Sequence, residues 1–167
     1  MNKIIILAGI PGSGKSTYAK ANMCPAFDEY VSRDEVRFSI VREDEEYFSH
    51  EGEVFNTFIK RIVKHLKSGA TVWVDATHLT KASRLKLLRA IPIKLDRIEL
   101  VWMNTPCELA LERNENRQGT RAYVPPSVIK RMFYQMEPPE FREDQFYYSK
   151  IYEVSPEEVV IREEVEK

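Results

Sequence analysis

The chain has 167 residues, of which 43% are hydrophobic, so it is the size of one domain that buries roughly two thirds of its unfolded surface. Its formal net charge of −1 argues against an indiscriminate nucleic-acid binder, because such proteins carry a strong basic excess. The apolar run from Ile4 to Ala8 is too short to span a bilayer and has no signal-peptide cleavage site, so we expect a cytoplasmic protein without a membrane contact.

The first expected element is a strand over residues 3–8, whose isoleucine-rich run KIIILA is typical of a strand buried on both faces of a parallel sheet. The segment GIPGSGKST, residues 9–17, follows directly and fits the pattern G-x-x-x-x-G-K-[ST] at every fixed position. A helix is expected over residues 16–21. Strand, glycine loop and helix in this order predict a phosphate-binding loop, in which backbone N–H groups surround phosphate oxygens.

Six residues of this loop are expected to contact ATP or another nucleoside triphosphate: Gly12, Ser13, Gly14, Lys15, Ser16 and Thr17. Lys15 is expected to reach the β- and γ-phosphates and to take part in catalysis. The hydroxyl of Ser16 is expected to coordinate Mg²⁺, because magnesium prefers hard oxygen ligands.

A candidate general base follows the second expected strand, residues 30–32. Asp34 opens a helix expected to run to residue 40, and a carboxylate beside an acceptor hydroxyl typically contributes about 10² to 10⁴ in rate. Arg37 lies one turn later on the same face, where it would engage an anionic acceptor. The neighbouring Glu35 is a second candidate for the base, and Asp34 as an ordinary first-turn residue is the plain alternative.

The middle of the chain alternates again between helix and strand. An apolar stripe predicts a packing helix over 54–66, and the β-branched run 71–74 predicts a strand that ends in Asp75. An aspartate at a strand end often helps to hold a metal ion, so Asp75 is the second candidate ligand for Mg²⁺; a helix cap or loop carboxylate is the alternative. A helix over 82–90 and a strand over 95–103 complete this part.

The last third of the chain is expected to supply a lid at about residues 113–127. Thr105, Pro106 and Glu108 combine into a helix-start signal, and this helix is expected to carry Arg113 and Arg117 on one face. Such arginines would clamp the phosphates in the closed state, with Arg117 acting in catalysis; a solvated basic helix end is the alternative. A helix over 128–136 and a strand over 151–154 follow, and an acidic tail covers about 153–167.

Strands that alternate with helices at this spacing predict an α/β fold with a parallel sheet, helices on both faces and a helical lid, which is the P-loop NTPase fold. The whole chain, 1–167, is expected to form one kinase domain. Ligands of such folds bind outside the carboxyl ends of the strands. The loop at Gly9, the segment at Asp34 and the strand end at Asp75 should therefore meet at one edge of the sheet.

These residues, in this order, resemble the kinase module of polynucleotide 5′-hydroxyl kinases of phage and bacterial nucleic-acid repair enzymes. The resemblance covers most of the chain and rests on four segments: GIPGSGKST, SRDEVRFSI, VDATHLT, and ERNENRQGTRAYVPPSVIKRMF from Glu112 onward. Every P-loop kinase shares the first segment, whereas the second and the fourth are much closer to this family in particular.

The resemblance implies that Lys15 and Ser16 bind ATP and metal, that Asp34 accepts the 5′-hydroxyl proton, and that Arg113 and Arg117 clamp the phosphates. It also implies that Arg37 contacts an acceptor phosphate. His78 departs from the pattern, because many members have Asn at this position.

The sequence thus predicts a Mg²⁺-dependent transfer of the γ-phosphate of ATP to the 5′-hydroxyl end of DNA or RNA. One alternative is a P-loop kinase of a small hydroxyl compound such as a nucleoside, a sugar or an antibiotic. Another is a nucleotide-binding switch protein with little transfer activity. A homo-oligomer or separate repair partners are compatible with all three.

Overall fold

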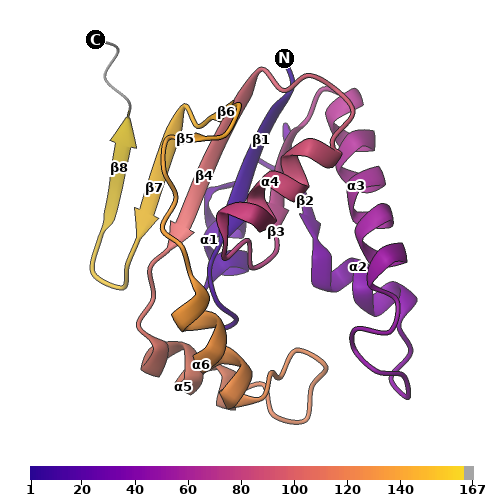
Figure 1. Cartoon of the computed structure of the whole chain (residues 1–167), viewed down its shortest axis with the longest axis vertical. Helices are drawn as coiled ribbons and strands as arrows, with labels where there is room; N and C mark the ends of the chain where they lie inside the picture. Colours follow the sequence, from indigo (N-terminus) through magenta and orange to yellow (C-terminus); the bar gives the residue numbers. More distant parts are fainter. Residues whose placement is uncertain (164–167) are drawn as a thin grey trace.

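The computed structural model describes residues 1–163, which build a twisted six-stranded sheet with the strand order β2-β3-β1-β4-β7-β8 (Figure 1). The five strands from β2 to β7 in this order run parallel, and β8 runs antiparallel to β7. The strands of the sheet are β1 (Lys3–Ala8), β2 (Asp28–Ser32), β3 (Thr71–Asp75), β4 (Arg97–Met103), β7 (Lys150–Val154) and β8 (Val159–Glu163). The α/β fold with a parallel sheet is therefore confirmed.

The helices occupy the connections between strands and lie within a few residues of the predicted ranges. They are α1 (Lys15–Asn22), α2 (Arg33–Ile40), α3 (Glu51–Lys67), α4 (Lys81–Ala90), α5 (Cys107–Glu115) and α6 (Pro126–Gln135). In Figure 1, α5, α6 and α2 lie at the end of the sheet toward which the parallel strands point. No helix of the described residues is both long and apolar enough to cross a membrane.

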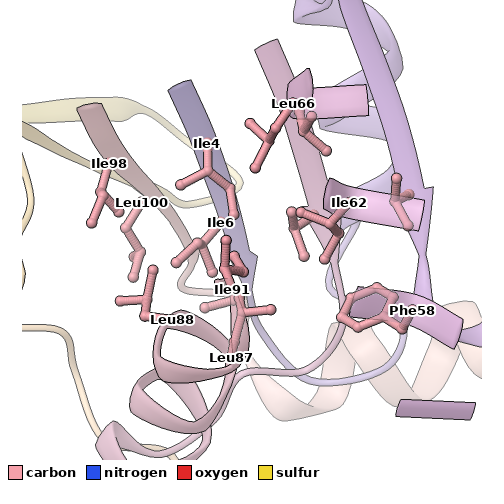
Figure 2. Close-up of a cluster of buried hydrophobic side chains, with 14 of the residues drawn as sticks. Ile4, Ile6, Phe58, Ile62, Leu66, Leu87, Leu88, Ile91, Ile98 and Leu100 are labelled. Carbon is pink, nitrogen blue, oxygen red and sulfur yellow. The ribbon is translucent and has the colours of Figure 1, made fainter. Parts of the chain in front are cut away.

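Both faces of β1 are buried, and its alternate side chains enter two different cores. Ile4 and Ile6 pack in the larger core against α3 and α4, with Phe58 and Leu87 among the contributors (Figure 2). Ile5 and Leu7 enter the smaller core, which α1 covers with Ala19. This two-sided burial is why the strand reads as a continuous apolar run rather than an alternating one.

The strand register places the three expected site segments at the same level of the sheet. Asp75 is paired with Leu7 of β1 on one side and with Ser32 of β2 on the other. The turn after β1, the first turn of α2 and the end of β3 therefore meet at one edge, as right-handed parallel connections require.

Two features of the C-terminal part were not predicted. The short antiparallel strands β5 (Arg142–Glu143) and β6 (Phe146–Tyr147) form a hairpin apart from the main sheet. Part of the acidic tail forms β8, whose three consecutive apolar residues Val159, Val160 and Ile161 are exposed. The remainder of that tail, 164–167, lies outside the described residues.

The hairpin is tied to α4 by a buried ion pair. Nη2 of Arg84 donates to Oε1 of Glu143 at 2.6 Å, and both side chains are 1% exposed. The hydroxyl of Tyr148 donates to the other carboxylate oxygen at 2.6 Å. Arg84 also donates to the backbone carbonyls of His78 and Glu137. This network satisfies the buried charges and connects the loop after β3 to the C-terminal part.

Candidate active site

The loop after β1 has the backbone shape of a phosphate cradle. Gly12 and Gly14 adopt φ angles of +80° and +93°, which residues other than glycine rarely adopt. A Cβ atom on Gly12 would lie 2.5 Å from the carbonyl oxygen of Ala110 in α5, so this glycine also permits a close approach of the two segments. Within the described part of the chain, the buried Ser13 Oγ has no hydrogen-bond partner. A cradle of this kind fits a phosphate group.

Lys15, at the start of α1, folds back over this loop. Its Nζ donates to the carbonyl oxygens of Gly9 at 2.9 Å and Ile10 at 3.1 Å. Burial lowers the pKa of Lys15, while the carboxylates of Asp75 and Asp34 act against that shift. The ammonium group of Lys15 thus lies within electrostatic range of both predicted carboxylates.

Asp75, at the end of β3, is buried and is held by a residue that no local sequence pattern marks. The hydroxyl of Tyr30 in β2 donates to Oδ2 of Asp75. Burial raises the pKa of Asp75, and the neighbouring Lys15 opposes that shift. Residues 1–163 contain no group of three or more His, Cys, Asp or Glu side chains that could hold a metal. The hard oxygens of Ser16 and Asp75 nonetheless fit Mg²⁺, which often uses one or two protein oxygens together with substrate phosphates.

Asp34 lies in the first turn of α2, and its side chain is 59% exposed. Nη1 of Arg37 donates to its Oδ1 at 2.6 Å, so the two residues share a helix face as expected. The hydroxyl of Tyr47, from the loop between α2 and α3, donates to the same oxygen at 2.5 Å. Nε of Arg37 donates to Glu51 Oε1 at 2.9 Å, and Arg37 is only 5% exposed. Contacts within the described residues occupy four of the five N–H groups of Arg37, and its predicted contact with an acceptor phosphate stays a prediction.

The two predicted clamp arginines do not share a helix face, which corrects the sequence expectation. Helix α5 ends at Glu115, and Arg117 lies in the turn that follows. The reason is Asn114, whose buried side-chain amide donates to Val124 O at 2.6 Å and accepts from Val124 N at 3.0 Å. These bonds turn the chain out of the helix and close the lid loop.

Both predicted clamp arginines, Arg113 and Arg117, nevertheless lie near the phosphate loop. Nη1 of Arg113 donates to the carbonyl oxygen of Gly12 at 3.2 Å. Arg117 is close enough to Lys15 to contribute to lowering the pKa of that lysine.

The start of helix α5 also differs from the sequence expectation: Pro106 is the N-cap, and Thr105 Oγ1 donates to Ser13 O at 3.0 Å. The threonine thus supports the phosphate loop instead of capping α5.

A cavity of about 360 Å³ lies between α2, the loop after it and the lid region, residues 113–127. Its lining combines aromatic and positively charged side chains, and Glu43 and Glu45 add negative charge. The aromatic and basic members are Arg37, Phe38, Arg42, Tyr47 and Arg121. The cavity shares Arg37 and Tyr47 with the hydrogen-bonded cluster around Asp34.

His78 is buried in a strained turn after β3, with φ at 41°. Its Nδ1 bonds the carbonyl of Leu7 at 2.7 Å, which requires a proton on that nitrogen. Burial lowers the pKa of His78 to about 4, so the ring is neutral near pH 7. Through this bond, His78 joins the segment after β3 to the end of β1.

The family of the chain follows from a match that includes the phosphate loop, α2 and the lid. A family profile described as an AAA domain matches residues 4–139. The chain belongs to the AAA domain family. Together with the phosphate loop, this membership makes it a nucleotide-binding P-loop protein.

Solved structures similar to this AAA domain protein differ in what they act on. A chain in the structure of the Pnkp1/Rnl/Hen1 RNA repair complex is 26% identical, with a TM-score of 0.68. The match covers 80% of the present chain and 43% of that one, so the chain spans less than half of its length. No curated protein sequence matches the chain.

Two kinases of small molecules share the fold at lower identity. A sugar kinase from Janibacter sp. is 15% identical with a TM-score of 0.65, over 95% of this chain and 87% of that one. The APS kinase CysC of Mycobacterium tuberculosis is 16% identical with a TM-score of 0.61, over 94% and 90% of the two chains.

Proposed function

We propose that the protein transfers the γ-phosphate of ATP to the 5′-hydroxyl end of a DNA or RNA strand. The observation that carries this proposal is the aromatic and arginine-lined cavity beside Asp34, at the same sheet edge as the phosphate loop. Aromatic faces accept nucleobases, and guanidinium groups bind phosphates. The 26% identical chain of an RNA repair complex supports the same acceptor class.

In this reaction Asp34 is the general base. The acceptor hydroxyl gives its proton to the carboxylate, and its oxygen forms a bond to the γ-phosphorus. The bond from that phosphorus to the oxygen bridging the β- and γ-phosphates breaks, and ADP leaves with the electron pair. Asp34 suits this role because its carboxylate is exposed and adjoins the cavity, whereas Asp75 is nearly buried.

The nucleotide would be held by the loop residues from Gly12 to Thr17 and by the lid. Lys15 would move from the loop carbonyls to the β- and γ-phosphates, and Arg113 and Arg117 would close over them. Ser16 and Asp75 would hold Mg²⁺, directly or through water. When bound, the ion would neutralise phosphate charge.

The test is transfer of label from γ-labelled ATP to 5′-hydroxyl oligonucleotides of DNA and RNA, with 5′-phosphorylated oligonucleotides as matched controls. We expect label on the 5′-hydroxyl strands alone, and lower affinity for them at higher salt because phosphate contacts release counterions. Binding of ATP without any label on an oligonucleotide would refute the acceptor class.

A small-molecule acceptor is the second candidate, and the contacts of Arg37 favour it. The guanidinium of Arg37 is buried and bonded to Asp34, Tyr47 and Glu51, so a phosphate on the acceptor is not needed to satisfy it. A competition between oligonucleotides and nucleosides or sugars for phosphate transfer separates the two candidates.

A further inference from the structure

Tyr47 and Arg37 both act on one oxygen of the proposed base. The Tyr47 hydroxyl lies 2.5 Å from Oδ1 of Asp34, and Nη1 of Arg37 lies 2.6 Å from the same atom. Both bonds end on Oδ1, and among residues 1–163 Oδ2 of Asp34 has no hydrogen-bond partner. The side chain is 59% exposed. One carboxylate oxygen is therefore held and the other is available to solvent.

The direction of these bonds follows from the donors. Nη1 of Arg37 also donates to the Tyr47 hydroxyl at 2.6 Å, and a phenol has only one proton to give. That proton therefore goes to Asp34. Burial and the adjacent Asp34 carboxylate raise the pKa of Tyr47, so the phenol remains a donor at neutral pH.

The cluster is anchored from a separate helix. Glu51, in the first turn of α3, accepts from Nε of Arg37 at 2.9 Å and from Nη2 at 3.2 Å. The Arg37 guanidinium in turn lies 4.2 Å from the centre of the Tyr47 ring. The phenol is thus fixed through its ring and through its hydroxyl, although it belongs to a loop.

We propose that Tyr47 is a positioning residue for Asp34: its hydroxyl, with Arg37, holds Oδ1 and leaves Oδ2 to accept the proton of the acceptor hydroxyl. This inference rests on the proposed transfer to a hydroxyl, but not on the identity of the acceptor. A neutral donor to a carboxylate fixes its orientation without adding the charge of a second cation.

The experiment compares Tyr47→Phe with Tyr134→Phe, which removes the hydroxyl of an exposed tyrosine on α6. Tyr47→Phe keeps the ring over Arg37. We expect it to lower kcat roughly tenfold to a hundredfold, the usual worth of a hydrogen bond to a charged group, while KM for ATP and for the acceptor stays unchanged. Tyr134→Phe should match the wild type.

Three results would overturn the proposal. An unchanged kcat would show that the hydroxyl does not position the base. A raised KM for the acceptor with normal kcat would make Tyr47 a substrate contact instead. A faster reaction would mean that the phenol competes with the acceptor for Asp34.

A second measurement does not depend on turnover. In protein labelled with ¹³C at the aspartate carboxyl groups, Tyr47→Phe should move the Asp34 resonance at pH 7, and Tyr134→Phe should leave it in place. An unmoved resonance would refute the contact itself. If the wild type phosphorylates no acceptor, the proposed function fails, and this resonance still decides whether Tyr47 acts on Asp34.

Discussion

Arg121 of the lid region donates a hydrogen bond from Nη2 to the carbonyl oxygen of Val41, the C-cap of α2, at 2.6 Å. A second bond joins Nη1 to the carbonyl of Phe38 at 3.2 Å, and the guanidinium lies 4.6 Å from the Phe38 ring centre. A cation at the C-terminal end of a helix satisfies free carbonyls and the helix dipole. The lid is thus attached to the helix that carries Asp34.

Removing this attachment should affect the acceptor more than the nucleotide. Arg121→Ala leaves Arg113 and the phosphate loop intact, so we expect an acceptor KM raised roughly tenfold and little change in ATP affinity. Arg131→Ala, at an exposed position of α6, is the control. Steady-state kinetics with each substrate varied would check this, and a selective loss of ATP affinity would contradict it.

Asp34→Asn should abolish most of the transfer, because it removes the base while preserving the shape of the side chain. The expected loss is about 10² to 10⁴ in kcat, with ATP binding unchanged by calorimetry. Glu35→Gln is the matched control, since Glu35 is the other acidic residue of the same helix turn. Equal losses of kcat in the two variants would contradict the role of Asp34 as the general base.

Arg117→Ala should lower kcat by about 10³ or more if this arginine stabilises the charge of the transferring phosphoryl group. Arg113→Ala should act differently, since Arg113 donates to Gly12 O and supports the loop itself. We expect its main effect on ATP affinity. Single-turnover rates at saturating ATP separate the two effects, and normal rates for Arg117→Ala would exclude its role in the transition state.

The parts of the site that the sequence predicted are those encoded by neighbouring residues. The phosphate loop, the start of α2 and the strand end at Asp75 each follow directly from a local pattern. Tyr30 and Tyr47 were missed because their partners, Asp75 and Asp34, lie 45 and 13 residues away, and no local signal marks such a contact.

Tertiary contacts also explain the errors at helix ends. Thr105 has the residue type of an N-cap, but its hydroxyl serves Ser13 of the phosphate loop, 92 residues away in sequence. Helix α5 stops before Arg117 because the side-chain amide of Asn114 hydrogen-bonds to both the N–H and the carbonyl of Val124. Asn114 lies between Arg113 and Arg117 in the sequence. A side chain that can bond to the backbone at this position was the one local sign that the helix would end before Arg117.

The buried Arg84–Glu143 pair should matter for stability far more than the exposed pair beside it. Glu143→Gln leaves the Arg84 charge buried and uncompensated, which should lower the free energy of unfolding by about 3 kcal/mol. The neighbouring Arg89–Asp144 pair is half exposed, and Asp144→Asn keeps a residue type that tolerates its φ of 56°. It should be nearly neutral. Urea unfolding of both variants checks this, and equal losses would contradict it.

His78 should make the fold sensitive to mild acid. Its pKa is lowered to about 4 by burial, from an ordinary value of 6.5, so the unfolded chain binds more protons between these two values. The contribution of the neutral His78 ring to the free energy of unfolding is therefore fully present above pH 6.5. It is lost as the pH falls to 4, and the total loss is about 3 kcal/mol.

His78→Asn isolates this effect, because asparagine tolerates the left-handed backbone of the turn and can donate to the Leu7 carbonyl without titrating. Unfolding free energies measured from pH 7 to pH 4 should fall more steeply in the wild type than in the variant. Because carboxylates titrate in both proteins, the difference between the two curves is the quantity that reports on His78. Parallel curves would show that the ring is protonated equally in the folded and unfolded chains, and would contradict its burial as a neutral donor.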